Sequence, residues 1–475
     1  SWSATAPAER GRVLAAVADG LDAARAELVA LASEETGLTA ARLDGELTRT
    51  IVQARLFADV AARGQYLDVR IDERDDDFVL GARPDLRRYL IPLGPVLNFA
   101  ASNFPFAFSV FGGDSVSALA AGCPVIVKLH SGHPRLGART VQIVREAFRG
   151  EGQHDGLFQS VSGQAEGVEL LRDPRIRAGS FTGSTRIGRY LAEIAAARPT
   201  PIPFYGELGS VNPVFVLPGA IEDDAEGLAR GLAASVAGSA GQLCTKPGIV
   251  FVPAGTGWAA DVAESLRTTP AHRLLTPSIS RAFEESVDSA VRTGAAAVLR
   301  GRLHVDDGLA WAAPWLLQTD AATLLAHPDT AEEIFGPVTI LVEYDSLDQA
   351  LEIASQLFPG NLTCTVHASM KDDQDDVARA LAWGTEHAGR VLHGGWPTGV
   401  SVTGAQQHGG PWPATTDSRS TAVGTASITR FLRPVTLQDV PEHLRPAPVS
   451  DANPWQVPQS RNADGPSHDW GGGSR

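Results

Sequence analysis

Cysteine is scarce in this chain, with three residues among 475. So few thiols cannot form a disulfide framework, and we expect a protein of the reducing cytoplasm. Long apolar runs are also missing: residues 90–127 are interrupted by prolines, glycines and Asp114, so they cannot form a membrane helix. No basic start followed by an apolar segment is present, so no signal peptide is expected. The sequence begins with Ser1 and not with methionine, so we expect that the first residues of the native protein are missing.

The chain has fewer basic than acidic residues: 40 Lys and Arg against 55 Asp and Glu, which gives a formal net charge of −15. Repulsion argues against nucleic acid or an anionic membrane as a general partner. A local Arg or Lys can still bind an anionic small molecule. The apolar fraction of 43% is that of an ordinary globular protein, and the length predicts two or three domains.

Apolar residues recur at helical spacing in the first sixty residues and predict amphipathic helices over 7–32 and 40–62. The acidic segment 68–77 and two short apolar runs after it predict a hairpin or an arm. From residue 93, strand-like apolar runs alternate with helices. This alternation predicts an open α/β domain whose parallel sheet is covered on both faces.

A second alternating series runs from residue 213 to residue 393 and predicts a second α/β domain. The chain after about residue 446 is rich in Pro, Ser, Asn, Asp and Gly, so a disordered tail is predicted there.

The stretch G-Q-L-C-T-K-P-G at 241–248 contains Cys244. A helix-compatible run of small residues precedes it, Pro-Gly ends any helix, and an apolar strand-like run follows. A cysteine on such a turn can be reached by a ligand, so Cys244 is predicted to be a reactive thiol. Cys123, at a strand entry, and Cys364, within a strand, are predicted to be structural.

Two further stretches indicate a nucleotide site. A glycine-containing turn at 181–188 follows a strand and opens a helix, where backbone N–H groups can approach a phosphate, although a plain tight turn fits equally well. Lys128 ends an apolar strand, and Ser131 follows it. No carboxylate occurs from 127 to 135, which favours NADP over NAD, with a solvent-facing strand end as the alternative.

Glu207 and Asn103 carry little signal by themselves. A glutamate in a loop is usually a solvated charge, and an asparagine between apolar runs usually caps a helix or a turn.

Four motifs nevertheless occur in a familiar order: F-T-G-S-T-R-I-G at 181–188, E-L-G at 207–209, G-Q-L-C at 241–244 and E-E-I-F-G-P-V at 332–338. Together they resemble the aldehyde dehydrogenase superfamily over about residues 7–440, with Asn103 and Lys128 fitting upstream.

Within that superfamily the sequence is similar to an NADP-preferring branch that includes 2,5-dioxovalerate (α-ketoglutaric semialdehyde) dehydrogenase and a bacterial fatty-aldehyde dehydrogenase. The stretches that carry this likeness are 241–248, 394–400 and 408–416, H-G-G-P-W-P-A-T-T. After E-L-G the superfamily commonly has a glycine, and this sequence has Ser210. This difference is also similar to the NADP-preferring branch, and it leaves Glu207 in place.

The resemblance implies a catalytic cycle. Cys244 as a thiolate attacks the aldehyde, and the amide of Asn103 with the backbone N–H of Cys244 holds the oxyanion of a thiohemiacetal. Hydride transfer to the nicotinamide gives a thioester. Glu207 activates water to hydrolyse it and is a candidate base for Cys244.

The resemblance also implies which residues bind the cofactor, NADP in preference to NAD. Lys128 and Ser131 would face the adenosine ribose, Glu333 the nicotinamide ribose and Phe335 the ring end. The full set is Lys128, Ser131, Gly163, Gly183, Ser184, Leu208, Glu333 and Phe335. Phe104 and Arg419 are candidate substrate residues, Arg419 because a substrate carboxylate requires a cation. No metal ligands are predicted.

The implied fold is α/β and aldehyde dehydrogenase-like. It has a Rossmann-type open parallel-sheet NAD(P)-binding domain (1–67 and 93–206), an α/β catalytic domain (207–407) and a small β oligomerisation arm or bridging segment (68–92 and 408–445). A strand near 426–438 would complete the arm, and the tail 446–475 follows. Such arms pair between subunits, so a homodimer is expected, with a homotetramer as the alternative.

The expected reaction is oxidation of 2,5-dioxovalerate to 2-oxoglutarate. The alternatives are oxidation of long-chain aldehydes, a CoA-acylating dehydrogenase, which does not need the water-activating Glu207, and an inactive cofactor-binding homologue.

Overall fold

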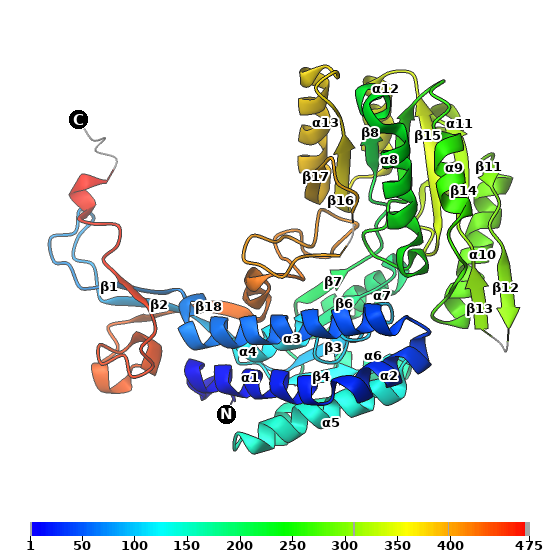
Figure 1. Cartoon of the computed structure of the whole chain (residues 1–475). Helices are drawn as coiled ribbons and strands as arrows, with labels where there is room; N and C mark the ends of the chain where they lie inside the picture. Colours follow the sequence, from blue (N-terminus) through cyan, green and yellow to red (C-terminus); the bar gives the residue numbers. More distant parts are fainter. Residues whose placement is uncertain (1, 307–308, 398, 471–475) are drawn as a thin grey trace.

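The computed structural model describes residues 2–306, 309–397 and 399–470. Two α/β units, each built on its own sheet, lie against each other, and an arm projects from one of them (Figure 1). Within the described residues, no helix combines the length and the apolar character that a membrane span requires.

The first unit is built on a five-stranded parallel sheet of order β5-β4-β3-β6-β7. Its strands are β3 (Val96–Phe99), β4 (Val125–Lys128), β5 (Phe158–Val161), β6 (Ala178–Thr182) and β7 (Phe204–Glu207). The helices of the unit are α1 (Pro7–Ala23), α2 (Arg25–Thr36), α3 (Ala40–Arg63), α4 (Gly113–Ala121), α5 (Pro134–Gly150), α6 (Gln164–Arg172) and α7 (Thr185–Ala196).

Both faces of this sheet are buried under helices. One apolar core joins the sheet to α1, α3, α4 and α5, and a smaller one joins it to α6 and α7. Because both faces of the sheet are covered, β3 is buried at all four positions, and its one polar side chain, Asn98, donates to the hydroxyl of Ser115 over 2.8 Å.

The second unit is built on a seven-stranded sheet of order β11-β14-β15-β9-β8-β16-β17, parallel except for β11. Its strands are β8 (Val214–Val216), β9 (Ile249–Pro253), β11 (Ala296–Leu299), β14 (Trp315–Asp320), β15 (Val338–Tyr344), β16 (Asn361–His367) and β17 (Ala388–His393). A small sheet of β10 (His272–Arg273), β12 (Leu303–Asp306) and β13 (Leu309–Ala312) adjoins it.

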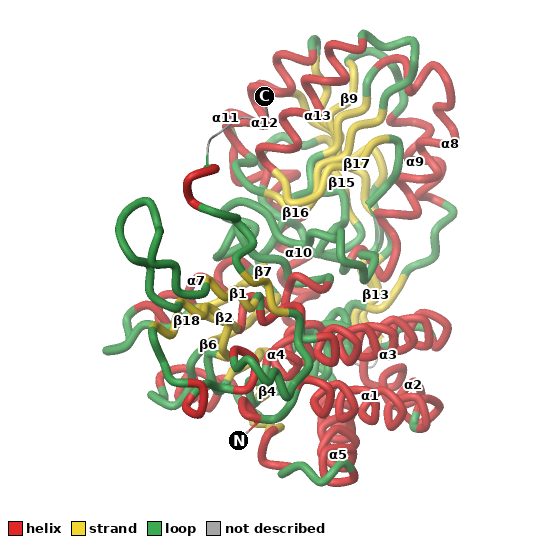
Figure 2. The backbone as a smooth tube through the Cα atoms, turned by 90° about the vertical axis from the view of Figure 1, so that its left-hand side faces the viewer, coloured by secondary structure: helices red, strands yellow, loops and turns green. Residues whose placement is uncertain are grey.

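Helices also cover both faces of the second sheet (Figure 2). On one face lie α8 (Pro218–Ala237) and α9 (Ala259–Arg267), and on the other lie α10 (Pro277–Arg292), α11 (Ala321–Ala326), α12 (Leu347–Leu357) and α13 (Gln374–His387). The predicted α/β fold with two parallel sheets is confirmed. Cys123 and Cys364 are buried in the two main cores, as predicted for structural thiols.

The arm is a four-stranded sheet of order β18-β2-β1-β19. It contains β1 (Val69–Asp72), β2 (Leu86–Pro92), β18 (Leu432–Gln438) and β19 (Gln459–Arg461). Short 3-10 helices complete the fold: η1 (Trp2–Ala4), η2 (Gln65–Leu67), η3 (Asp155–Leu157), η4 (Gly238–Gly241), η5 (Pro328–Ala331), η6 (Thr425–Phe431), η7 (Glu442–Leu444), η8 (Ala447–Val449) and η9 (Ser467–Asp469).

The disordered tail predicted from residue 446 is wrong as far as residue 470. β19 pairs in parallel with β1, and Val449 and Val457 are buried against the apolar side of the arm. Arg87 also donates to the carbonyl oxygen of Val449. The burial of a few apolar residues against the sheet of the arm orders this segment, although most of its residues are polar. Residues 471–475 lie outside the described residues.

The segment 408–424, which we assigned to the arm, lies against the end of β7 instead. Thr415 forms a β-bridge with Glu207, and the backbone N–H of Leu208 donates to the carbonyl oxygen of Ala414 over 2.8 Å. Further along the chain, it is β18 that pairs with β2 and extends the arm. The division into domains stays a prediction, which the two sheets support, since they use residues 96–207 and 214–393.

Candidate active site

The turn that carries Cys244 links η4, just after α8, to β9. Ser239, Ala240 and Gly241 all have φ between 53° and 65°, in the left-handed region. At Gly241 a side chain is excluded, because a Cβ would lie 2.1 Å from the carbonyl oxygen of Gly336. The close approach of the Gly336 backbone therefore explains why the G-Q-L-C motif begins with a glycine.

Two side-chain amides fix the turn. Asn212 donates through Nδ2 to the carbonyl oxygens of Cys244 and Lys246, over 2.8 and 2.9 Å. Gln242 accepts a hydrogen bond from the backbone N–H of Leu275 over 2.8 Å. The backbone around Cys244 is thus held from both sides, and its side chain stays half-buried rather than enclosed.

Glu207 and His408 lie directly beside the thiol. Nε2 of His408 is 3.5 Å from Sγ of Cys244 and 2.9 Å from Oε1 of Glu207. Both polar side chains are buried, with His408 0% and Glu207 3% exposed. Nδ1 of His408 has no hydrogen-bond partner among the described residues. Glu207 comes from the end of β7, and His408 from the long loop after β17.

Burial raises the pKa of the Cys244 thiol well above its usual range, and the negative charges of Glu207 and Glu333 raise it further. In the protein alone the thiol therefore holds its proton, and a neighbouring base is needed to produce the nucleophile. His408 and Glu207 are the groups in position to receive that proton.

Asn103 lies in the loop between β3 and α4. Its Nδ2 donates to the carbonyl oxygen of Gln242 over 3.1 Å, so the amide touches the residue two before Cys244. Arg42 of α3 fixes this loop, donating to the carbonyl oxygen of Asn103 over 2.8 Å and to the buried carboxylate of Glu46 over 3.0 Å. Asn103 therefore contacts the backbone of the Cys244 turn, and its role as an oxyanion donor stays a prediction.

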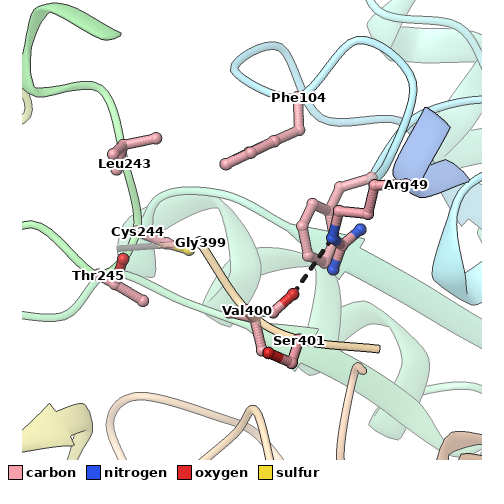
Figure 3. Close-up of a pocket in the computed structure, with 9 residues that line it drawn as sticks. Arg49, Phe104, Leu243, Cys244, Thr245, Gly399, Val400 and Ser401 are labelled. Atoms are coloured by element: carbon pink, nitrogen blue, oxygen red, sulfur yellow. Dashed lines mark hydrogen bonds between the residues drawn. The ribbon is translucent and has the colours of Figure 1, made fainter. Parts of the chain in front are cut away.

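A cavity of about 220 Å³ opens beside Cys244 (Figure 3). Phe104 and Phe108 give it an aromatic wall, and Arg49 of α3 lines it as well. The complete lining is Arg49, Phe104, Phe108, Leu243, Cys244, Thr245, Gly399, Val400 and Ser401. Of the predicted substrate residues, Phe104 lines the cavity. The side chain of Arg419 is 90% exposed and does not line it.

A second, much smaller cavity of about 10 Å³ is lined by Glu207, His408 and Thr415 among others. That volume is about what one water molecule needs. Glu207 therefore borders a space of the size of one water molecule, whereas Cys244 lines the larger cavity.

The carboxyl edge of the five-stranded sheet suits a dinucleotide. Ser184 begins α7 without capping it through its side chain, which leaves the first backbone N–H groups for an anion. At Gly183 a Cβ would lie 2.6 Å from the ring of Phe181, so the turn stays narrow. Gly163 begins α6 at a φ of 98°. These features fit a pyrophosphate.

Lys128 ends β4 and packs against α6, and burial lowers the pKa of its ammonium group. Ser131 is exposed in the turn that follows. Burial also lowers the pKa of His130 to about 3, so this ring is neutral near pH 7. Lys128 is therefore the cation at this strand end.

Glu333 lies close to Gly209, where a Cβ would be 2.4 Å from its carboxylate, which explains the glycine of the E-L-G motif. Burial raises the pKa of Glu333, and the neighbouring Lys246 opposes the rise. Leu208 is buried, and Phe335 is half-buried two residues beyond Glu333. The cofactor residues on either side of Cys244 thus belong to both units.

Sequence reasoning missed His408 and Arg49. His408 occurs in the stretch 408–416 that carried the resemblance to a branch, but no role was assigned to it. Arg49 appeared as one charge among many on an amphipathic helix. No local pattern marks either residue. The ligand atoms of Glu207, Cys244 and His408 lie within 4.8 Å of one another, although a metal site was not predicted, and that absence stays a prediction.

The sequence pattern of the Aldehyde dehydrogenase family matches residues 1–412. Among curated proteins, the chain is 38% identical to alpha-ketoglutaric semialdehyde dehydrogenase of Acinetobacter baylyi, over 95% of this chain and 86% of that protein. It is 39% identical to alpha-ketoglutaric semialdehyde dehydrogenase 2 of Azospirillum brasilense, over 96% of this chain and 87% of that protein.

Solved structures share the fold at lower identity. One is 1-pyrroline-5-carboxylate dehydrogenase from Thermus with bound NAD, with a TM-score of 0.79 and 23% identity over 92% of this chain and 82% of that chain. Another is an NAD-dependent aldehyde dehydrogenase from Sinorhizobium meliloti, with a TM-score of 0.76 and 24% identity over 93% of this chain and 84% of that chain. The chain belongs to the aldehyde dehydrogenase family, and it is an NAD(P)-dependent oxidoreductase that acts on aldehydes.

Proposed function

We propose that the protein oxidises 2,5-dioxovalerate to 2-oxoglutarate, with NADP as the preferred cofactor. The observation that carries the chemistry is the contact of His408 with both Cys244 and Glu207, with Cys244 lining the 220 Å³ cavity and Asn103 hydrogen-bonded to the Cys244 turn. The substrate follows from the two relatives, which are named for this semialdehyde and align with nearly the whole chain.

In the first step His408 receives the proton of Cys244, since its Nε2 lies 3.5 Å from Sγ. Glu207, 2.9 Å from the same nitrogen, stabilises the imidazolium that forms. The thiolate attacks the aldehyde carbon, and the Asn103 amide and the backbone N–H of Cys244 hold the oxyanion.

A bound nicotinamide would supply the acceptor for the hydride that leaves the thiohemiacetal carbon on Cys244, and a thioester to Cys244 would remain. Glu333 and the α7 N-terminus with Gly183 and Ser184 would hold the cofactor, and Lys128 with Ser131 would face a 2′-phosphate. Glu207 then activates water against the thioester, and the small cavity beside it has about the volume of that water. Release of 2-oxoglutarate returns the free thiol of Cys244.

The preference for NADP rests on Lys128 at the end of β4 and on the lack of a carboxylate from 127 to 135. The arm supports a homodimer, because β18 and β19 both leave a sheet edge that a second copy can cover, with a tetramer as the alternative. Three free cysteines support a reducing, cytoplasmic location.

The deciding experiment is an aldehyde panel assayed with NAD and NADP separately, with and without CoA. We expect the highest kcat/KM for 2,5-dioxovalerate with NADP, no need for CoA, and no turnover by Cys244→Ala, which should still bind NADP. A higher kcat/KM for long-chain aldehydes would replace the substrate, and strict dependence on CoA would replace the reaction.

A further inference from the structure

Arg49 places a cation in the wall of the substrate cavity (Figure 3). It lies on the face of α3 that also presents Arg42 and Glu46, at spacings of seven and three residues. Nε of Arg49 donates to the carbonyl oxygen of Val400 over 3.2 Å, and the guanidinium lies over the ring of Phe108 at 5.3 Å. These contacts hold the group at the cavity.

The charge of Arg49 has no direct counterion. Nη1 and Nη2 are buried and have no hydrogen-bond partner, and the guanidinium forms no ion pair, within the part of the chain that the structure describes. Glu46 is already committed, because it accepts from Arg42 and from the backbone N–H groups of Phe106 and Ala107. A buried cation with two unpartnered nitrogens costs free energy unless a ligand supplies an acceptor.

Two other arginines are candidates for binding an acidic group of a ligand. Arg390 on β17 also has buried nitrogens without partners, but it does not line the cavity. Arg419 is exposed and paired with Asp417. Arg49 is the arginine that lines the space a substrate on Cys244 would fill.

We propose that Arg49 binds the carboxylate at the far end of the substrate and so makes the enzyme selective for acidic aldehydes. This inference rests on the proposed function and deepens it. A carboxylate pairs with the two free nitrogens in a fork geometry, and the rings of Phe104 and Phe108 keep water from the pair. A neutral aldehyde would leave both nitrogens unpartnered, which is the stronger source of discrimination.

The test uses two five-carbon aldehydes that differ in charge, glutarate semialdehyde and pentanal, beside 2,5-dioxovalerate. In Arg49→Gln, KM for the two acidic aldehydes should rise about 10- to 100-fold, the range expected for lost charge-assisted hydrogen bonds. KM for pentanal should change less than about threefold on the same reasoning. Arg49→Lys, which keeps the charge without the fork, should fall between the wild type and Arg49→Gln.

Arg55→Gln is the matched control, because Arg55 lies on the same helix but is exposed and paired with Asp19. It should leave the selectivity unchanged. A measurement on the wild type alone covers the case in which Arg49→Gln does not fold: glutarate should inhibit competitively at far lower concentration than its uncharged diamide.

The outcomes separate the two proposals. A wild type that prefers pentanal refutes the proposed substrate before any variant is compared. A wild type that prefers acidic aldehydes, with equal losses for all three aldehydes in Arg49→Gln, refutes the role of Arg49 and leaves the substrate intact. Selectivity that survives in Arg49→Gln and disappears in Arg390→Gln would assign the carboxylate to Arg390. Equal inhibition by glutarate and its diamide would also count against Arg49.

Discussion

Replacement of His408 by glutamine isolates the proton transfer that starts the reaction. The glutamine amide nitrogen can occupy the position of Nε2, 2.9 Å from Glu207 and 3.5 Å from Sγ of Cys244, but it cannot accept a proton. The side chain is fully buried, and its backbone N–H is held by Thr421 over 2.9 Å, so the loop keeps its anchor. His408→Gln therefore removes the base with little change of shape.

The size of the effect follows from the thiol. An ordinary cysteine with a pKa of about 8.5 is about 3% ionised at pH 7. Burial raises the pKa of Cys244, and Glu207 and Glu333 raise it further, so its thiolate fraction without a base is smaller still. Loss of His408 should slow the attack about 10²–10⁴-fold, the usual range for the loss of a general base.

Single-turnover experiments measure the attack separately from hydrolysis. The burst of reduced cofactor should slow in His408→Gln at pH 7 and recover as the pH rises. The direction follows from the raised thiol pKa: the thiolate is absent below that pKa and forms only as the pH climbs through it. The wild-type burst should depend less on pH over the same range.

Thermal unfolding of the variant shows whether the loss is structural. A burst at the wild-type rate, with slower steady-state turnover, would refute the reasoning, because Glu207 would then receive the proton and His408 would serve hydrolysis alone. An unchanged pH profile with a reduced rate would equally show that His408 only shapes the site.

Three other predictions concern residues on either side of the thiol. Glu207→Gln should keep a burst of reduced cofactor but lower the steady-state rate about 10²–10⁴-fold, since hydrolysis loses its base; an equal loss in both phases would contradict this. Asn103→Ala should lower kcat about 10²–10³-fold with a smaller change in KM, as expected for an oxyanion donor, and Asn103→Ser should not restore it. Lys128→Ala should raise KM for NADP and leave KM for NAD nearly unchanged; a parallel rise would mean that Lys128 contacts a part common to both cofactors.

The sequence predicted the framework of the site well because the signals for it are local. Glycines and Pro247 punctuate the Cys244 turn, and strand and helix periods alternate on both sides of it. Lys128 stands at the end of a predicted strand, where parallel sheets gather functional groups along one edge. These signals depend on neighbours in the chain. Glu207 had no such signal: it was expected in a loop, and β7, the strand that it ends, was not predicted.

His408 could not be found in this way, because it lies 164 residues from Cys244 in a loop without periodicity. Its proximity to the thiol depends on pairing between segment 408–424 and the end of β7, as in the bridge between Thr415 and Glu207. A long-range contact of this kind leaves no trace in local composition. The same limit explains the tail, whose polar sequence hides Val449 and Val457, the residues that dock on the arm.

Not all charged residues on the amphipathic helix α3 are exposed to solvent. Glu46 is buried next to the apolar Leu47, and Arg49 is half-buried, although their pattern is that of a solvated helix face. An uncompensated buried charge would destabilise the fold by several kcal/mol, about the size of a domain's net stability. Arg42 forms an ion pair with Glu46, whereas Arg49 forms none among the described residues, and the cavity it lines is where a counterion can arrive.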